Sequence, residues 1–246
     1  MSRIGRGFRL ALGFLTVLPV GTLRGEVTPA ELAASRFFYP PVGLLIGAVL
    51  AGLSLGLSRI GAPGATAAWG LVAVSVVLTG GLHLDGLADT FDGLFLGGGP
   101  QRRLEVMRDP RVGSHGVVAV ALVLIGKVMA VQAIGDGRRA LALLGAAAIA
   151  RTLLLLSAGM AGYARPEGTG RLVIESAGLG GVLAAVVLAL AIGAATCGTR
   201  GLVGGLVAIA VVMGLTALSS RRLGGITGDT LGASVELGEL AFLLAV

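Results

Sequence analysis

The sequence is poor in the side chains that a soluble domain places on its surface. Asp, Glu, Lys and Arg make up 13% of the 246 residues, whereas they are about a quarter of an ordinary globular domain. Hydrophobic residues make up 55%, and they gather in runs long enough to cross a bilayer. A soluble domain is therefore excluded, and we predict an all-α, polytopic helical membrane protein.

Cysteine and aromatic residues are also scarce. The single cysteine, Cys197, excludes an intrachain disulfide, and its position in an apolar run is typical of a packing residue. The net charge of +6 could indicate a nucleic-acid partner, but aromatic residues are only 4% and form no array with basic ones. We therefore expect no nucleic-acid partner and attribute the basic excess to the positive-inside rule.

The apolar runs predict about seven membrane spans. They lie at about 37–58, 64–84, 116–135, 139–160, 178–197, 201–218 and 231–246. Before them, residues 1–36 are expected to contain a short interfacial or re-entrant helix. With no repeat period and no long linker, we predict one integral-membrane domain over residues 1–246, surrounded by lipid and rich enough in small residues to permit a homo-oligomer.

The loops give this topology an orientation. Seven spans would place thirteen of the nineteen basic residues on the side of the N-terminus and only four on the opposite side. Because basic loops are retained in the cytoplasm, the N-terminus and all the long polar loops are predicted to face the cytoplasm.

The most informative stretch is HLDGLADTFDG, residues 83–93. It places Asp85, Asp89 and Asp92 at i, i+4 and i+7, so on a helix the three carboxylates share one face. Uncompensated carboxylates at this spacing repel one another. An oxygen-only set suits Mg²⁺, which usually takes one or two carboxylates and completes its shell with substrate phosphates. A solvated acidic turn is the alternative interpretation.

Three further polar stretches are predicted to meet the aspartates at the cytoplasmic face. They are RRLEVMRDPRVGSHG at 102–116, YARPEGTGR at 163–171 and GGITGDTLGASVELGE at 224–239. The arginines of 102–116 can bind phosphates, although topology alone would also place them there. In the last stretch, Thr227 and Asp229 are candidate N-cap groups, and Asp229 shares a helix face with Glu236.

Charged side chains also fall within the predicted spans. Lys127 and Arg151 lie about 15 Å from the cytoplasmic ends of their helices, and Glu236 and Glu239 lie in the last span. Intramembrane charges cost about 2.5 to 3.5 kcal/mol each, so they face a partner or a cavity. We expect either Lys/Arg–Glu pairs that hold the bundle together or a polar cavity open to the cytoplasm.

The chemistry available is that of carboxylates, arginines and a hard metal, which suits displacement at phosphorus. His83 and His115 have no third nitrogen or sulfur ligand nearby for zinc. We therefore expect these histidines to have helix-end or hydrogen-bonding roles. The alternative is a cation- or proton-coupled transporter that uses the acidic rows as an ion path. The cytoplasmic clustering of charge and the short outer loops favour an enzyme.

These motifs, taken together, resemble the cobalamin synthase family of adenosylcobinamide-GDP ribazoletransferases. The resemblance rests on HLDGLADTFDG, MRDPRVGSHG, YARPEG and GGITGDTLGA in order, with FLTVLPVG and FFYPPVGLLIG before them. CDP-alcohol phosphotransferases share D-x-x-D-G at 89–93, but Leu96 and Gly97 stand where their signature has Ala-Arg. The resemblance to that second family therefore fails.

The resemblance implies an inner-membrane transferase that needs Mg²⁺. It would join adenosylcobinamide-GDP to α-ribazole or its 5′-phosphate, give adenosylcobalamin or its 5′-phosphate, and release GMP. Asp85, Asp89 and Asp92 are then expected to hold the metal, and one of them or Asp229 to take the hydroxyl proton. The expected substrate-binding residues are His83, Arg102, Arg103, Arg108, Asp109, His115, Lys127, Arg151, Arg165 and Glu236.

Overall fold

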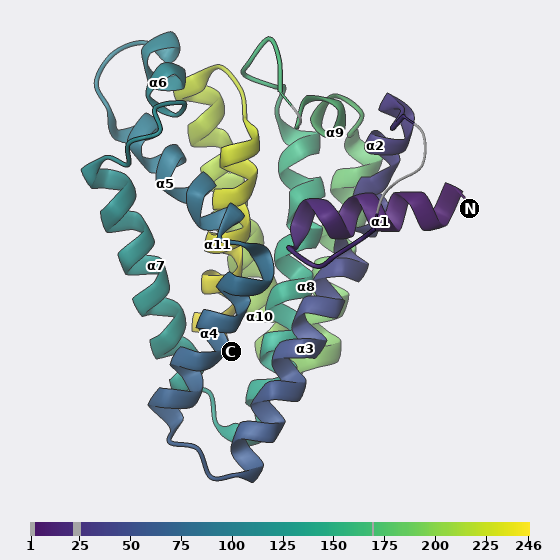
Figure 1. Cartoon of the computed structure of the whole chain (residues 1–246), viewed down its shortest axis with the longest axis vertical. Helices are drawn as coiled ribbons and strands as arrows, with labels where there is room; N and C mark the ends of the chain where they lie inside the picture. Colours follow the sequence, from purple (N-terminus) through teal and green to yellow (C-terminus); the bar gives the residue numbers. More distant parts are fainter. Residues whose placement is uncertain (1–2, 22–25, 169) are drawn as a thin grey trace.

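The structure is a computed structural model that describes residues 3–21, 26–168 and 170–246. Over these ranges the chain forms α-helices and one 3₁₀ turn but no β-strand, which confirms the predicted all-α class. Long helices lie side by side, while the short helices α6 and α9 lie at one end and the turn between α3 and α4 at the other (Figure 1).

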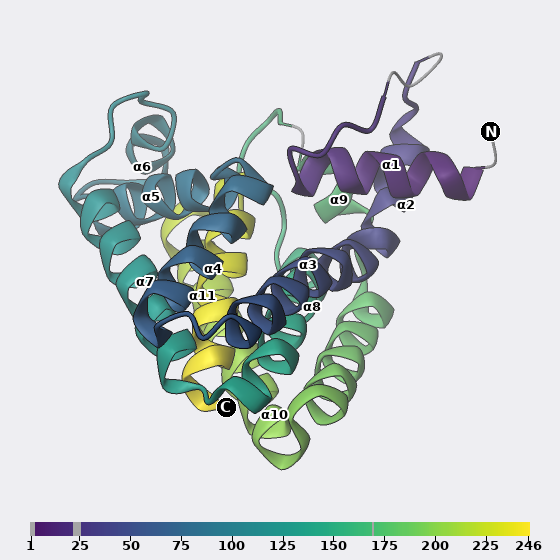
Figure 2. The same ribbon diagram turned by 60° about the horizontal axis from the view of Figure 1, so that its bottom comes forward.

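The N-terminal part leads into the first long helix. It comprises α1 (Arg3–Leu15), α2 (Pro29–Ser35), a 3₁₀ turn (Arg36–Phe38) and α3 (Tyr39–Arg59). Thr28 and Glu31 form a capping box at the start of α2, and prolines occupy the first turn of α3, where proline is tolerated. Figures 1 and 2 show α1 crosswise to the long helices, the orientation expected of an interfacial helix.

The second predicted span ends earlier than expected. We expected it at 64–84, but α4 (Gly64–Thr79) stops at Gly80 and Gly81, whose φ angles are +61° and +70°. Glycine adopts this left-handed region without the penalty of a Cβ. The two glycines turn the chain by 89° into α5 (Leu82–Phe95), so the aspartate stretch forms a separate helix. Residues 85–115, which include most of two of the predicted polar stretches, are thus largely helical.

The remaining elements are α6 (Pro100–Val106), α7 (Ser114–Ala133), α8 (Asp136–Met160), α9 (Arg171–Glu175), α10 (Leu179–Leu223) and α11 (Gly228–Ala245). The backbone of Gly198 is not helical and divides α10 into two legs. The legs fold back so tightly that a Cβ on Gly193 would clash with the carbonyl of Gly201. The two spans predicted at 178–197 and 201–218 therefore form one helical hairpin.

Length and apolarity identify candidate membrane spans among the described residues. They are Pro29–Arg59, Ser114–Ala133, Asp136–Met160 and Leu179–Leu223, with the bent pair α4–α5 as a possible fifth. This number is lower than the predicted seven for two reasons. The continuous helix α10 contains two of the predicted spans, and α11 carries three carboxylates within 18 residues, which makes it too polar to be identified as a span by apolarity. A multi-pass helical membrane protein is confirmed, while seven crossings stay a prediction.

Candidate active site

The four polar stretches meet at one end of the molecule. Gly86 of α5 faces the start of α11, where a Cβ would lie 2.8 Å from the carbonyl oxygen of Asp229. The loop after α8 pairs with the segment before α11, since Ala164 N donates to Ile226 O at 2.8 Å and Ile226 N to Gly162 O at 2.9 Å. Glycine at position 86 thus permits the close approach that joins the first, third and fourth stretches.

Asp92 joins the remaining stretch to α5. Asp92 is 7% exposed, and its carboxylate accepts the backbone N–H groups of Gly113 at 2.7 Å and Gly116 at 2.9 Å. These N–H groups lie at the start of α7, where unpaired donors and the helix dipole favour a negative charge. A Cβ on Gly116 would lie 2.5 Å from an Asp92 oxygen. Asp92 therefore holds the loop 102–116 against the aspartate helix.

Asp85 and Asp89 have different surroundings from Asp92. Asp85 is exposed and Asp89 half-buried, and neither carboxylate has a hydrogen bond or ion pair within the described part of the chain. Asp229, across from them, accepts from Arg165 Nη2 at 2.8 Å and from the Thr227 hydroxyl at 3.2 Å. Of the two N-cap candidates, Thr227 is the N-cap of α11, whereas Asp229 lies in the first turn of that helix.

These carboxylates form a donor set that could hold a divalent cation. Asp85, Asp92 and Asp229 all lie close enough to Asp89 for their charges to act on it. Among the described residues, no three His, Cys, Asp or Glu side chains converge on one point. Mg²⁺ usually takes only one or two protein carboxylates and completes its shell with water and phosphate. Asp85 and Asp89, with Asp229 nearby, fit a site of that kind.

The predicted phosphate-binding arginines are engaged to different degrees. Arg103 donates to the carbonyl oxygens of Gly98 at 3.1 Å and Gly93 at 3.0 Å, so it caps the end of α5. Arg102 pairs with Glu105 at 3.3 Å on the surface, where such pairs contribute little. Arg108 is exposed, and its guanidinium forms no hydrogen bond or ion pair with any described residue. Of the three, it is the most available to a ligand.

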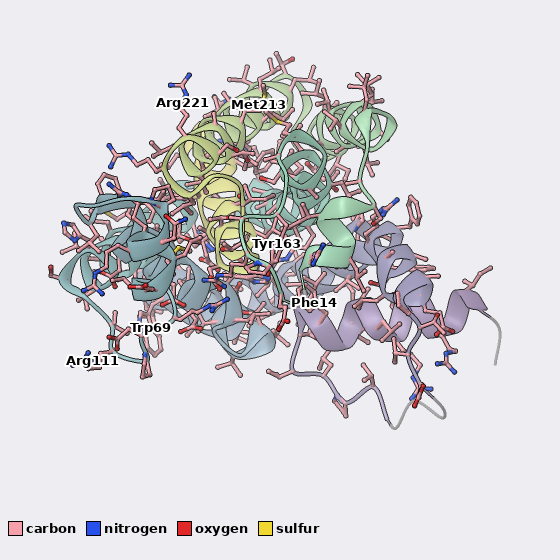
Figure 3. All side chains as sticks on the ribbon, turned by 90° about the horizontal axis from the view of Figure 1, so that it is seen from above. Phe14, Trp69, Arg111, Tyr163, Met213 and Arg221 are labelled. Atoms are coloured by element: carbon pink, nitrogen blue, oxygen red, sulfur yellow. The ribbon has the colours of Figure 1, made fainter. Side chains whose placement is uncertain are left out.

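The neighbouring Asp109 is occupied by Arg111, a residue outside the predicted set. The guanidinium contacts both carboxylate oxygens, at 2.9 and 2.8 Å. These hydrogen bonds lower the pKa of Asp109 to about 2, so at neutral pH it is charged and paired. His115 is exposed, and its ring stacks on Phe95 at a centroid distance of 6.0 Å. Seen from above, Arg111 lies at the edge of the molecule, and Phe14 and Tyr163 nearer its centre (Figure 3).

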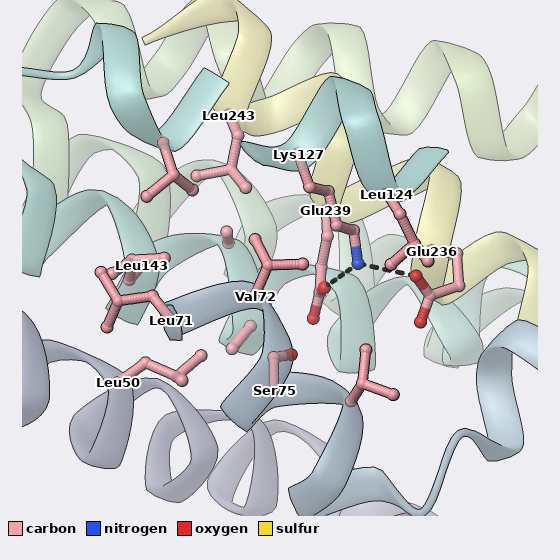
Figure 4. Close-up of a pocket in the computed structure, with 14 residues that line it drawn as sticks. Leu50, Leu71, Val72, Ser75, Leu124, Lys127, Leu143, Glu236, Glu239 and Leu243 are labelled. Atoms are coloured by element: carbon pink, nitrogen blue, oxygen red, sulfur yellow. Dashed lines mark hydrogen bonds and ion pairs between the residues drawn. The ribbon is translucent and has the colours of Figure 1, made fainter. Parts of the chain in front are cut away.

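The buried charges form an ion-pair network deeper in the bundle. Lys127 Nζ lies 2.7 Å from Glu236 Oε2 and 2.5 Å from Glu239 Oε2 (Figure 4), and the Arg151 guanidinium also contacts Glu239. Two positive and two negative groups thus link α7, α8 and α11. This is the pairing that the first of our two interpretations of the intramembrane charges predicted. Glu239, the shared partner, was expected as a possible pairing residue but not as a site residue, because only the tertiary packing of α7, α8 and α11 brings it to both bases.

A small cavity adjoins this network. Its volume is about 20 Å³, which is enough for one water molecule. A larger cavity of about 140 Å³ lies nearer the aspartates and is lined by His83, Asp85 and Asp229 together with Phe14 and Tyr39. His83 is only 3% exposed, and its Nδ1 has no hydrogen-bond partner among the described residues. The larger cavity therefore reaches the group of carboxylates.

An apolar helical bundle with carboxylates and arginines gathered at one end defines a multi-pass membrane protein with a polar reactive face. The sequence model of the family described as cobalamin-5-phosphate synthase matches residues 7–246. The chain belongs to this family, and it is an enzyme, a transferase. The predicted family is thus confirmed.

Two curated relatives illustrate the similarity, and both are named adenosylcobinamide-GDP ribazoletransferase. The protein of Klebsiella pneumoniae subsp. pneumoniae is 40% identical over 244 residues, which cover 98% of this chain and 99% of that one. The protein of Escherichia coli strain K12 is 38% identical over 252 residues, which cover 97% and 98%. No solved structure matches the chain.

Proposed function

We propose that the protein joins adenosylcobinamide-GDP to α-ribazole, or to its 5′-phosphate, at the end of the bundle that carries the aspartates. The observation that carries this proposal is the pair Asp85 and Asp89, two carboxylates on one face of α5 without a protein partner in the described ranges. The names of the relatives supply the reaction, and the carboxylates beside arginines supply the groups that displacement at phosphorus requires.

In the proposed reaction, a ribose hydroxyl that is free in both acceptors, and is therefore not the 5′-hydroxyl, attacks the phosphorus attached to the corrinoid arm. A new O–P bond forms, the bridging P–O bond of the diphosphate breaks, and GMP leaves. The hydroxyl proton passes to a carboxylate. Asp89 is half-buried and its carboxylate makes no hydrogen bond with the described residues, so its oxygens are free to accept the proton, whereas Asp229 is already held by Arg165.

Asp85 and Asp89, with Asp229 beside them, would hold Mg²⁺, which neutralises phosphate charge and stabilises a leaving oxygen when bound. Asp92 was predicted as a third ligand, but its two oxygens already accept N–H groups of α7. We assign Asp92 the positioning of that helix start. Arg165 already holds Asp229 beside the aspartates, and the Arg108 guanidinium is exposed without a partner among the described residues, so we assign these two arginines to the diphosphate.

The surroundings of the buried charges support an enzyme over a carrier. A carrier needs a polar route to both faces of the membrane. The cavity beside Lys127 and Glu239 is small, and many of its other walls are apolar, including Leu50, Leu143 and Leu243. We further propose that the protein lies in the inner membrane with the aspartate end toward the cytoplasm, because thirteen of the nineteen basic residues fall on that side of the predicted topology.

The test is a reconstituted assay. The purified chain in lipid nanodiscs is incubated with adenosylcobinamide-GDP and α-ribazole, with Mg²⁺ or with EDTA, and GMP and the corrinoid product are measured. We expect equal amounts of both products, and only with the metal. Equal rates of GMP release with Mg²⁺ and with EDTA would show that the reaction does not need the metal. No product with any divalent cation would overturn the reaction itself.

A further inference from the structure

The cavity of about 140 Å³ beside the aspartates has the lining of a site for a flat apolar ring. Besides His83, Asp85 and Asp229, its walls include Phe14, Leu15, Tyr39, Leu154 and Leu231. An apolar cavity of about 150 Å³ in another protein admits benzene. The space is thus of the size that a small aromatic ring system occupies.

Two aromatic side chains give this cavity a flat wall. The rings of Phe14, from α1, and Tyr39, from the start of α3, lie 6.0 Å apart at an angle of 20°. Tyr39 is fully buried, whereas Phe14 is 38% exposed. A near-parallel pair of this kind offers its faces to a third ring, and such contacts add to the free energy of burial.

His83 adds a polar group to the otherwise apolar walls. It is buried on α5 with an Nδ1 that has no partner among the described residues, and buried polar atoms of this kind normally have one. A substituted benzimidazole in a nucleoside retains one ring nitrogen that accepts a hydrogen bond. An imidazole N–H is a matching donor.

We propose that this cavity binds the bicyclic base of the nucleoside acceptor, an inference that rests on the proposed function. The base would enter between α1, α3, α5 and α11, with its rings against Phe14 and Tyr39. Asp85 and Asp229 line the same cavity, so the ribose would lie toward the carboxylates. The attacking ribose hydroxyl would then lie on the side where a carboxylate can take its proton.

The test separates the two substrates in the reconstituted assay. In Phe14→Ala we expect the KM for α-ribazole to rise about five-fold, with kcat and the KM for adenosylcobinamide-GDP unchanged. Leu154→Phe, which narrows the cavity, should also raise the KM for α-ribazole and leave kcat and the KM for adenosylcobinamide-GDP unchanged. Phe8→Ala is the matched control, because Phe8 lies on the same helix but packs edge-on against Phe38. It should leave all three constants unchanged.

Equilibrium dialysis of α-ribazole against the chain without the second substrate provides an independent readout, and Phe14→Ala should weaken this binding by a similar factor. A rise in the KM for adenosylcobinamide-GDP instead would assign the cavity to the corrinoid substrate and overturn the inference. Unchanged constants in both cavity variants would also overturn it. Absence of GMP release by the wild-type chain would contradict the proposed function itself, which is a different result.

Discussion

Asp89 and Asp92 lie about one turn apart on α5, yet their carboxylates have different surroundings. Asp89 is half-buried with no hydrogen bond to the described residues, whereas Asp92 is buried and accepts two backbone N–H groups of α7. Removing the charge should therefore damage the chemistry at one position and the fold at the other. The same substitution at both positions makes a matched pair of variants.

In Asp89→Asn we expect kcat to fall by at least about 100-fold, because the amide can neither take a proton nor neutralise a metal ion. Thermal unfolding in detergent should change little, since no contact of the described structure is lost. The measurement is GMP release beside a melting curve. Loss of the folded state in this variant would mean that the aspartate row is structural.

In Asp92→Asn we expect lower stability, by about 1.5 to 3 kcal/mol, because hydrogen bonds to a charged acceptor are lost. One amide N–H would also face a backbone N–H at the start of α7. The melting temperature should fall, and added phospholipid or substrate should restore part of the activity. If Asp92→Asn instead kept its full stability but lost turnover, Asp92 would be a metal ligand as the sequence predicted.

At the scale of the elements, the crossing of α5 over α11 depends on Gly86. Alanine in a helix interior is normally more favourable than glycine by about 1 kcal/mol. Here a Cβ would lie 2.8 Å from the backbone carbonyl oxygen of Asp229 and 3.1 Å from its Cα. Backbone atoms cannot rotate away, so the two helices would have to separate.

We therefore expect Gly86→Ala to lower both the melting temperature and kcat, despite its better helix propensity. The control is Gly52→Ala in α3, where a Cβ would meet nothing within 4 Å; it should be neutral or stabilising. Differential scanning fluorimetry and the GMP assay measure the two effects. A Gly86→Ala chain as stable and active as the control would show that α5 and α11 are not held at this distance.

The sequence predicted the positions of most helices, because long apolar runs have few alternatives in a membrane. It also predicted the common face of the aspartates and the N-cap at Thr227. It did not predict the turn at Gly80 and Gly81, whereas it placed a break between two spans at 198–200, where Gly198 divides α10. With 43 glycines in the chain, nothing local distinguishes a glycine that reverses the backbone from one that only lets helices approach.

Contacts between distant segments set the rest of the site and were beyond the sequence. The spacing of Asp85, Asp89 and Asp92 could not reveal that the start of α7 engages only the last of them. Likewise, Arg103 looked like a phosphate-binding residue, but it donates to carbonyl groups at the end of α5. The residue types indicated the chemistry, and tertiary packing decided which residues are left available for it.

At the scale of the whole molecule, the ion-pair network ties α7, α8 and α11 together below the active site. Lys127, Arg151, Glu236 and Glu239 are all buried, and their formal charges cancel. The depth of Lys127 and Arg151 could be predicted from helix length, and pairing with glutamates was one of two interpretations, but which glutamate meets which base could not be predicted. Because the same α11 carries Asp229 at its start, the network also holds the helix of that carboxylate against α7 and α8.

We expect Lys127→Met to lower the free energy of unfolding by about 3 to 5 kcal/mol, since it leaves buried carboxylates without their cation. Adding Glu236→Gln should recover part of the loss, because the double variant again buries equal numbers of positive and negative charges. A cycle of the two single variants and the double variant, followed by thermal unfolding, measures this coupling. If Lys127→Met instead kept its stability but bound adenosylcobinamide-GDP more weakly, Lys127 would contact the substrate, and the cavity beside it would open to the cytoplasm during turnover.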